Sequence, residues 1–303
     1  MPFDNSTLSL QEIEQLEHKY LMKYWYFLKF CEDEIVSGIK SMEDIRSDWN
    51  GRYGTGRGGT SEFDVGCERI IYALLNGKIA GRPNSSPVSS DLFFEVDDAY
   101  IHIDLKSVTT NEGTDRDKDN IDDFSEDIFI GRNQNSYNFE MGVRVNKSQC
   151  TPEQLAKFEK PDDANKKTVT IRRPYIPNLP QFYTKTNGDK KITLTYFVCL
   201  LNSTISSETQ MVSILCMPNG LLSQHYDIRP LKAGKTIDKV TLEDGSVIER
   251  YTARYKFKEV SSFELLNGIK KRVRIVYKNP NMSNYVKNKL NFYLDNFDPT
   301  VEE

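Results

Sequence analysis

Apolar and polar residues alternate most clearly between residues 100 and 108, in YIHIDLKSV. Isoleucine and leucine take every second position, and the polar positions between them include Asp104 and Lys106. A period of two predicts a strand with one buried face. The preceding segment DLFFEV, which Asp91 opens, predicts a second strand, with a turn at residues 97–99. Such a β-hairpin would fold Asp91 back toward Asp104 and Lys106.

Two carboxylates and an ammonium group gathered on one hairpin have a definite chemistry. Carboxylates hold hard cations through oxygen ligands, and the backbone carbonyl of Leu105 lies between the two polar positions. A lysine beside them can orient or deprotonate a water and offset charge on a phosphate oxygen. This combination suits the cleavage of a phosphodiester bond. The alternative is an ordinary half-buried strand, because 44 acidic and 40 basic residues make an Asp-x-Lys triplet common by chance.

Helical periodicity is strongest near the beginning of the chain. Residues 9–42 and 61–77 both place apolar residues at three- and four-residue steps, which predicts two helices. The glycine-rich stretch 49–60 between them predicts a connector, or a loop whose arginines touch a phosphate backbone. In the second helix Glu68 lies off the centre of the apolar stripe. It either faces the hairpin carboxylates or is simply solvated.

The remaining chain alternates strands with polar segments. The pattern at 151–166 predicts a helix, capped by Thr151 with Pro152 at its first position. Continuous apolar runs predict strands buried on both faces at 191–201 and 210–217. A hairpin is expected at 240–258 and an alternating strand at 270–278. Residues 110–125 form a long polar excursion after the Asp104 strand.

Composition places few further limits. A hydrophobic content of 38% and an aromatic content of 11% indicate a folded chain. No apolar run reaches membrane-spanning length and no signal peptide is recognisable, so we expect a cytoplasmic protein without a membrane partner. The five cysteines form no Cys-x-x-Cys pair, which argues against a zinc site. The net charge of −4 hides two basic stretches, at 166–173 and 270–274.

Several segments together resemble one nuclease family. A helix with a glutamate followed by the D…DxK hairpin resembles the PD-(D/E)XK core. VGCER, DLKSV, RPYIPNLPQFY, TYFV, MPNGLL and KKRVRI follow in the order found in the BglI-like group of type II restriction endonucleases. The resemblance, which implies a prokaryotic protein, covers about a third of the residues in register, and Ser90 stands where that family usually has proline.

The resemblance implies an α/β fold: a central mixed β-sheet flanked by helices, preceded by an N-terminal helical segment. We expect one nuclease domain over residues 1–303, in which 1–60 form that segment with the glycine-rich loop and 61–303 form the catalytic core. Carried over by position, Asp91, Asp104, Lys106 and Glu68 would be catalytic, and Asp91, Asp104 and the Leu105 carbonyl would hold metal. Arg272 matches a base-contacting arginine of that family, and DNA contacts are expected from four residues of its basic strand: Lys270, Lys271, Arg272 and Arg274. The alternative is a solvated basic edge strand.

By the same resemblance the cofactor would be Mg²⁺, one or two ions per active site. The substrate would be double-stranded DNA, cut in both strands by a homodimer at an interrupted palindrome. A cognate DNA methyltransferase would act on the same site without needing to bind the nuclease. Two alternatives stay open: a structure-specific repair or junction nuclease of the same fold, and a non-catalytic DNA-binding protein. His102 could be a general base, but a polar neighbour of the site fits its position better.

Overall fold

A computed structural model describes most of the 303-residue chain. The structure describes residues 2–53, 60–75, 81–83, 90–110, 127–130, 139–175, 180–203, 208–225, 229–241, 245, 247–256, 272–288 and 290. Lys270, Lys271 and most of the polar excursion at 110–125 lie outside these residues, as do the side chains of Glu68 and His225.

The centre of the fold is a seven-stranded mixed sheet with a path of six strands in the order β1-β2-β3-β8-β9-β12, and β7 pairs with the end of β8. Its strands are β1 (Arg82–Pro83), β2 (Leu92–Glu95), β3 (Ala99–Thr109), β7 (Phe182–Thr184), β8 (Lys190–Asn202), β9 (Thr209–Met217) and β12 (Val273–Lys278). Only β3 and β8 run parallel to each other; the other pairs are antiparallel. The prediction that the strands at 191–201 and 210–217 are buried on both faces is confirmed, since every residue of β9 is buried.

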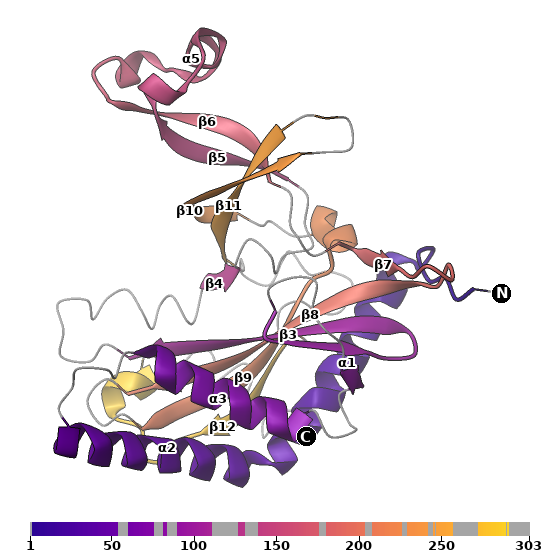
Figure 1. Cartoon of the computed structure of the whole chain (residues 1–303), viewed down its shortest axis with the longest axis vertical. Helices are drawn as coiled ribbons and strands as arrows, with labels where there is room; N and C mark the ends of the chain where they lie inside the picture. Colours follow the sequence, from indigo (N-terminus) through magenta and orange to yellow (C-terminus); the bar gives the residue numbers. More distant parts are fainter. Residues whose placement is uncertain are drawn as a thin grey trace.

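Three helices cover this sheet: α1 (Leu10–Phe30), α2 (Glu32–Tyr53) and α3 (Thr60–Leu75). In Figure 1 they lie together in its lower half, with α1 against β9 and β12. The prediction of a single helix over 9–42 is wrong, because the helix breaks at Cys31 and restarts. Its beginning is as expected: the Ser9 side chain accepts from the backbone N–H of Glu12, whose carboxylate reaches back to Ser9.

Two smaller sheets stand apart from the central one. One contains β10 (Arg229–Thr241), β11 (Val247–Lys256) and β4 (Asp127–Ile130). The other pairs β5 (Phe139–Asn146) with β6 (Thr168–Tyr175), and between them come η1 (Lys147–Gln149), α5 (Pro152–Phe158) and η2 (Pro161–Asp163). We call residues 139–175 the arm, and Figure 1 shows it extending away from the central sheet and its helices.

Several sequence predictions need correction at element ends. The helix expected at 151–166 is only the short α5, although Thr151 caps it through Gln154 and Pro152 stands at its start as predicted. The expected connector at 49–60 is helical as far as Tyr53. The hairpin at 240–258 exists but its first strand begins already at Arg229. Within the described residues, no helix is long and apolar enough to cross a membrane.

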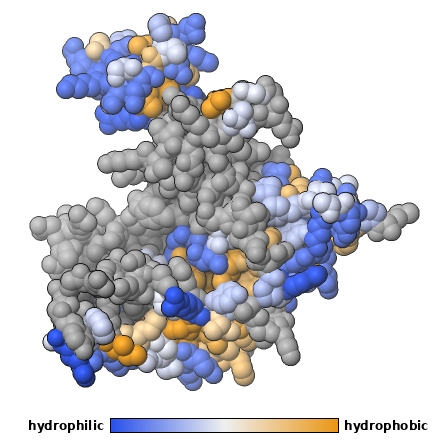
Figure 2. Space-filling model, viewed as in Figure 1, coloured by the Kyte–Doolittle hydropathy of each residue, from blue (hydrophilic) through white to orange (hydrophobic). Residues whose placement is uncertain are grey.

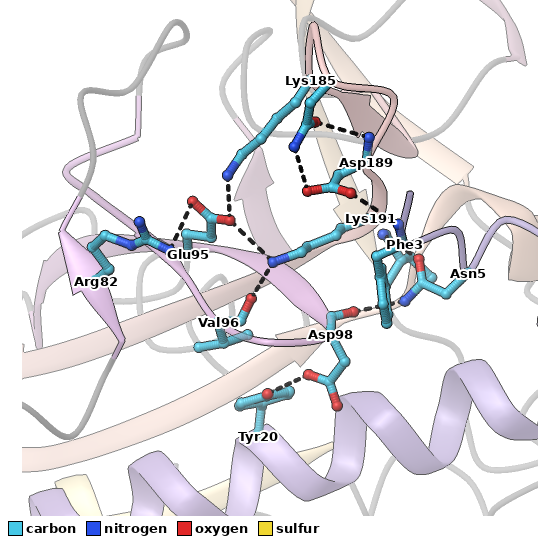
Figure 3. A network of polar contacts seen from close by, with 12 residues as sticks. Phe3, Asn5, Tyr20, Arg82, Glu95, Val96, Asp98, Lys185, Asp189 and Lys191 are labelled. Atoms are coloured by element: carbon cyan, nitrogen blue, oxygen red, sulfur yellow. Dashed lines mark hydrogen bonds and ion pairs between the residues drawn. The ribbon is translucent and has the colours of Figure 1, made fainter. Parts of the chain in front are cut away.

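A polar network anchors the turn end of the β2–β3 hairpin (Figure 3). Buried Glu95 accepts from Lys185 at 2.6 Å and from Lys191 at 3.0 Å. Burial alone would raise the pKa of Glu95, but the two lysines outweigh it and hold that pKa below its usual value. In the turn itself, the backbone carbonyl of Asp98 accepts from the Asn5 side chain at 2.6 Å, and its carboxylate accepts from Tyr20. The end of the hairpin remote from Asp104 is therefore held by two lysines at Glu95 and by residues of the N-terminal segment at Asp98.

Candidate active site

The hairpin brings Asp91 and Asp104 together as the sequence predicts. The antiparallel register pairs Leu92 with Ile103. Asp91, one residue before Leu92, therefore lies opposite Asp104, one residue after Ile103. One carboxylate oxygen of Asp91, Oδ2, accepts the backbone N–H of Leu105 at 2.7 Å. Asp91 is exposed, whereas Asp104 is only 1% exposed. One carboxylate therefore faces solvent while its neighbour lies in the sheet.

The environment of Asp104 strongly favours its protonated form. Burial raises the pKa of Asp104 to about 7, and the carboxyl group of Asp91 adds to the rise. Lys106 opposes this shift through an ion pair with the Asp104 carboxylate, but it does not overcome the burial. A buried carboxyl group that titrates near neutrality is characteristic of functional positions. A cation bound beside it would favour the ionised form.

Lys106 occupies the next position on the same face of β3. Its ammonium group pairs with Asp104 and lies 5.6 Å from the ring centroid of Phe197 on β8. The side chain is 30% exposed, so the amine can reach a group that approaches from solvent. The parallel register places Phe197 beside Asp104 and Cys199 beside Lys106. These two residues of β8 are therefore the lateral neighbours of both site side chains.

The oxygen donors suit a divalent metal ion. Asp91, Asp104 and the carbonyl of Leu105 are hard oxygen ligands of the kind that Mg²⁺ and Ca²⁺ take. Two carboxylates in neighbouring register repel each other, and a divalent cation would relieve that repulsion. Glu68 is placed on α3, which contacts β3, but its side chain is outside the described residues. Among the described side chains no group of three acidic, histidine or cysteine residues could form a complete metal cage.

His102 does not have the properties of a general base. Its ring is fully buried, stacks on Phe93 at 4.4 Å between centroids, and shares a hydrogen bond of 2.8 Å with the Ser90 hydroxyl through Nδ1. Burial lowers the pKa of His102 to about 3, so the imidazole is neutral at physiological pH. The interpretation of His102 as a polar neighbour of the site is therefore the one that its surroundings favour.

The basic strand at the C-terminal side differs from the expectation. Arg272 is 5% exposed, and its guanidinium lies 2.7 Å from Glu17 and 3.5 Å from Glu14, both on α1. Burial raises the pKa of Glu17 although Arg272 opposes the rise. Arg274 is equally buried and donates to the carbonyl of Val273 at 2.8 Å. In this structure both arginines are committed to the protein interior, where no base edge can reach them.

Sequence reasoning missed the contribution of β8 to the site. Phe197 lies under Lys106, and Cys199 faces both Lys106 and Asp104; burial raises the pKa of the Cys199 thiol to about 12. The run KITLTYFVCLL signals only a buried strand. Its pairing with β3 is a tertiary fact, and no local signal in the sequence indicates it.

Comparisons with known proteins identify the family of the chain. Family models of the type II restriction enzyme MwoI match the chain over residues 9–171 (N-terminal domain) and 210–278 (central domain). No curated relative matches the chain by sequence. Strands from both matched segments share the central sheet, β3 from the first and β9 and β12 from the second.

Two solved structures are similar in fold. The restriction endonuclease BglI bound to its DNA recognition sequence has a TM-score of 0.52 at 15% identity, over 88% of this chain and 90% of that one. The tetrameric restriction endonuclease SfiI bound to cognate DNA has a TM-score of 0.50 at 15% identity, over 93% and 90%. Both support the mixed sheet flanked by helices that the sequence predicts. With the family models covering more than half of its residues, the chain belongs to the MwoI family of type II restriction enzymes and is a site-specific DNA endonuclease.

Proposed function

We propose that this endonuclease hydrolyses both strands of duplex DNA in a Mg²⁺-dependent reaction, at an interrupted palindrome. The observation that supports it most directly is the alignment of Asp91, Asp104 and Lys106 on one hairpin. Mg²⁺, when bound, would polarise the scissile phosphate and lower the pKa of a bound water. Asp91, Asp104 and the Leu105 carbonyl would hold it.

In the proposed reaction the protein residues have separate tasks. Lys106 orients the attacking water and stabilises the charge that develops on the phosphate, a role in which one oriented cation is worth about 2–4 kcal/mol. The N–H of Leu105 keeps the Asp91 carboxylate in place. Phe197 limits the freedom of the Lys106 side chain from below. Glu68 is proposed to assist near the metal, from the helix that contacts β3.

Cutting both strands of a symmetric site requires two active sites related by a two-fold axis, so we propose a homodimer. Lys270 and Lys271 remain proposed DNA contacts. Arg272 and Arg274 would need to leave their buried positions to touch bases. Their burial therefore argues against a role for them as DNA contacts. The single-domain organisation over 1–303 and a cytoplasmic location also remain predictions. A cognate methyltransferase is proposed to act on the same sequence without binding the nuclease.

Digestion of a plasmid of known sequence tests the proposal. Purified protein with Mg²⁺ should give discrete fragments whose sequenced ends define one interrupted palindrome, and chelation of the metal should stop the reaction. A smear, or nicking confined to flaps and junctions, would instead identify a structure-specific nuclease. No cleavage at all with Mg²⁺ would favour a DNA-binding protein without catalysis.

Two variants connect the activity to the hairpin. Asp104→Ala and Lys106→Ala should each lose cleavage while DNA binding stays measurable. In Asp104→Ala the removal of a carboxylate also relieves its repulsion of the phosphates. Lys40→Ala, at an exposed position on α2, is the matched control and should cut like the wild type. Full cutting by Asp104→Ala would refute the site assignment.

A further inference from the structure

The arm has buried apolar residues of its own, and its strands β5 and β6 also contact β10 and β11. Val145, Val169 and Ile171 are buried on its inner face, at 8%, 2% and 0% exposure. Partly buried side chains of the η1–α5 segment, Leu155 and Phe158, pack into the same apolar cluster. On the other face of the ribbon, Arg144, Thr170 and Arg172 are exposed. In Figure 2 the end of the arm at the top of the view is largely hydrophilic.

The outer face of the β5–β6 ribbon presents arginines and threonines. Gly142 pairs with Arg172 and Arg144 pairs with Thr170 in the antiparallel register, so the two arginines are diagonal neighbours on one face. Arg144, Arg172 and Thr170 are exposed. Arg144 also donates from Nε to the hydroxyl of Thr168 on β6 at 2.8 Å, which ties the guanidinium group to the neighbouring strand.

Charge within the arm is distributed unevenly. Residues 139–175 contain eight lysines and arginines against five acidic residues, so the arm carries +3 in a chain whose net charge is −4. Two acidic groups at its tip are paired: Lys147 binds Glu159, and Lys166 binds Asp163 at 2.8 Å. Among the described residues, no carboxylate pairs with the two arginines of the ribbon. By register the outer face of the ribbon carries Arg144 and Arg172 together with the acidic position Glu140, so two arginines face one carboxylate there.

We propose that this face binds the sugar-phosphate backbone of the duplex outside the cleaved bond. Arginines and hydroxyl groups are the usual donors to phosphate oxygens, and such contacts orient a protein on DNA without reading bases. The proposal rests on the proposed function, since it names a second contact with the same substrate. It gives a role to the basic stretch 166–173, which the catalytic hairpin does not use.

The salt dependence of binding measures these contacts directly. Each phosphate contact contributes about 0.9 to the slope of log K against log salt. Arg144→Ala with Arg172→Ala should therefore reduce the slope by about 1.8, equivalent to about a 12-fold smaller loss of affinity between about 50 and 200 mM salt. The probe is a fluorescent duplex of mixed sequence with Ca²⁺ in place of Mg²⁺, and it needs no knowledge of the recognition site.

Two further variants make the result specific. Arg144→Lys with Arg172→Lys keeps the charge and should keep the wild-type slope. Lys23→Ala with Lys40→Ala removes the same charge from exposed positions on α1 and α2, and it should also keep the slope. Thermal melting of each variant checks the fold, which should be unchanged because all the altered side chains lie on the surface.

The outcomes separate the arm from the catalytic proposal. If the wild type cuts plasmid at discrete sites and the double alanine variant keeps the wild-type slope, the arm proposal alone fails. If that variant changes sedimentation and leaves the slope unaltered, the face is an interface with a second copy, and the proposal is again overturned. If the wild type neither binds nor cuts duplex DNA, the proposed function itself fails.

Discussion

Replacing Asp104 by asparagine should stabilise the metal-free protein, and increasingly so at higher pH. Asp104 is 1% exposed and its pKa is raised by burial to about 7. The folded state therefore keeps this proton up to neutrality, whereas an unfolded aspartate loses it near pH 4. In this window the free energy of unfolding falls with rising pH, because the folded state binds more protons than the unfolded state.

The size of the effect follows from the pKa difference. One pKa unit corresponds to about 1.4 kcal/mol, so the wild type should lose about 2–3 kcal/mol between about pH 5 and pH 8 through this group. Asp104→Asn keeps the shape of the side chain and cannot ionise. Its stabilisation relative to the wild type should therefore be larger at pH 8 than at pH 5 by that same amount.

Thermal melting in chelator, at both pH values, is the assay. Asp44→Asn on α2 is the matched control, since it removes an exposed carboxylate. Added Mg²⁺ should stabilise the wild type and leave Asp104→Asn nearly unaffected, because the ion binds the folded carboxylate form. An Asp104→Asn stabilisation that does not change with pH would refute the conclusion that Asp104 is protonated in the metal-free site.

Two other predictions concern buried charges away from the hairpin's catalytic end. Arg272→Met should destabilise the fold by about 3–5 kcal/mol in urea unfolding, since it leaves Glu14 and Glu17 buried without their cation. A loss below about 1 kcal/mol would show that Arg272 is free for another role. Glu95→Gln should lower the melting temperature more at pH 7 than at pH 3, because the lowered pKa of Glu95 gives stability that is present when it is ionised and lost as the pH falls through that pKa. Equal losses at both pH values would contradict this.

The sequence determined the elements whose pattern is local. Strict alternation at 100–108 and the turn before it predicted the β2–β3 hairpin, and the period of two placed Asp104 and Lys106 on one face. The capping residue Thr151 marked the start of α5 for the same reason, since a cap satisfies backbone groups only three residues away. Register within a hairpin is set by its turn, so the meeting of Asp91 with Asp104 could be predicted as well.

Other features depended on contacts between distant segments. Arg272 has the sequence appearance of a DNA-reading arginine, yet α1 brings two carboxylates to it from more than 250 residues away, at Glu14 and Glu17. The raised pKa of Asp104 likewise requires β8 as a parallel neighbour, which buries the carboxyl group. The spacing of apolar residues over 9–42 continues almost unchanged across Cys31, so the sequence did not predict that the helix breaks there. Burial and charge pairing are properties of the packed chain, because they depend on which surfaces meet, and a linear pattern specifies only which surface each element offers.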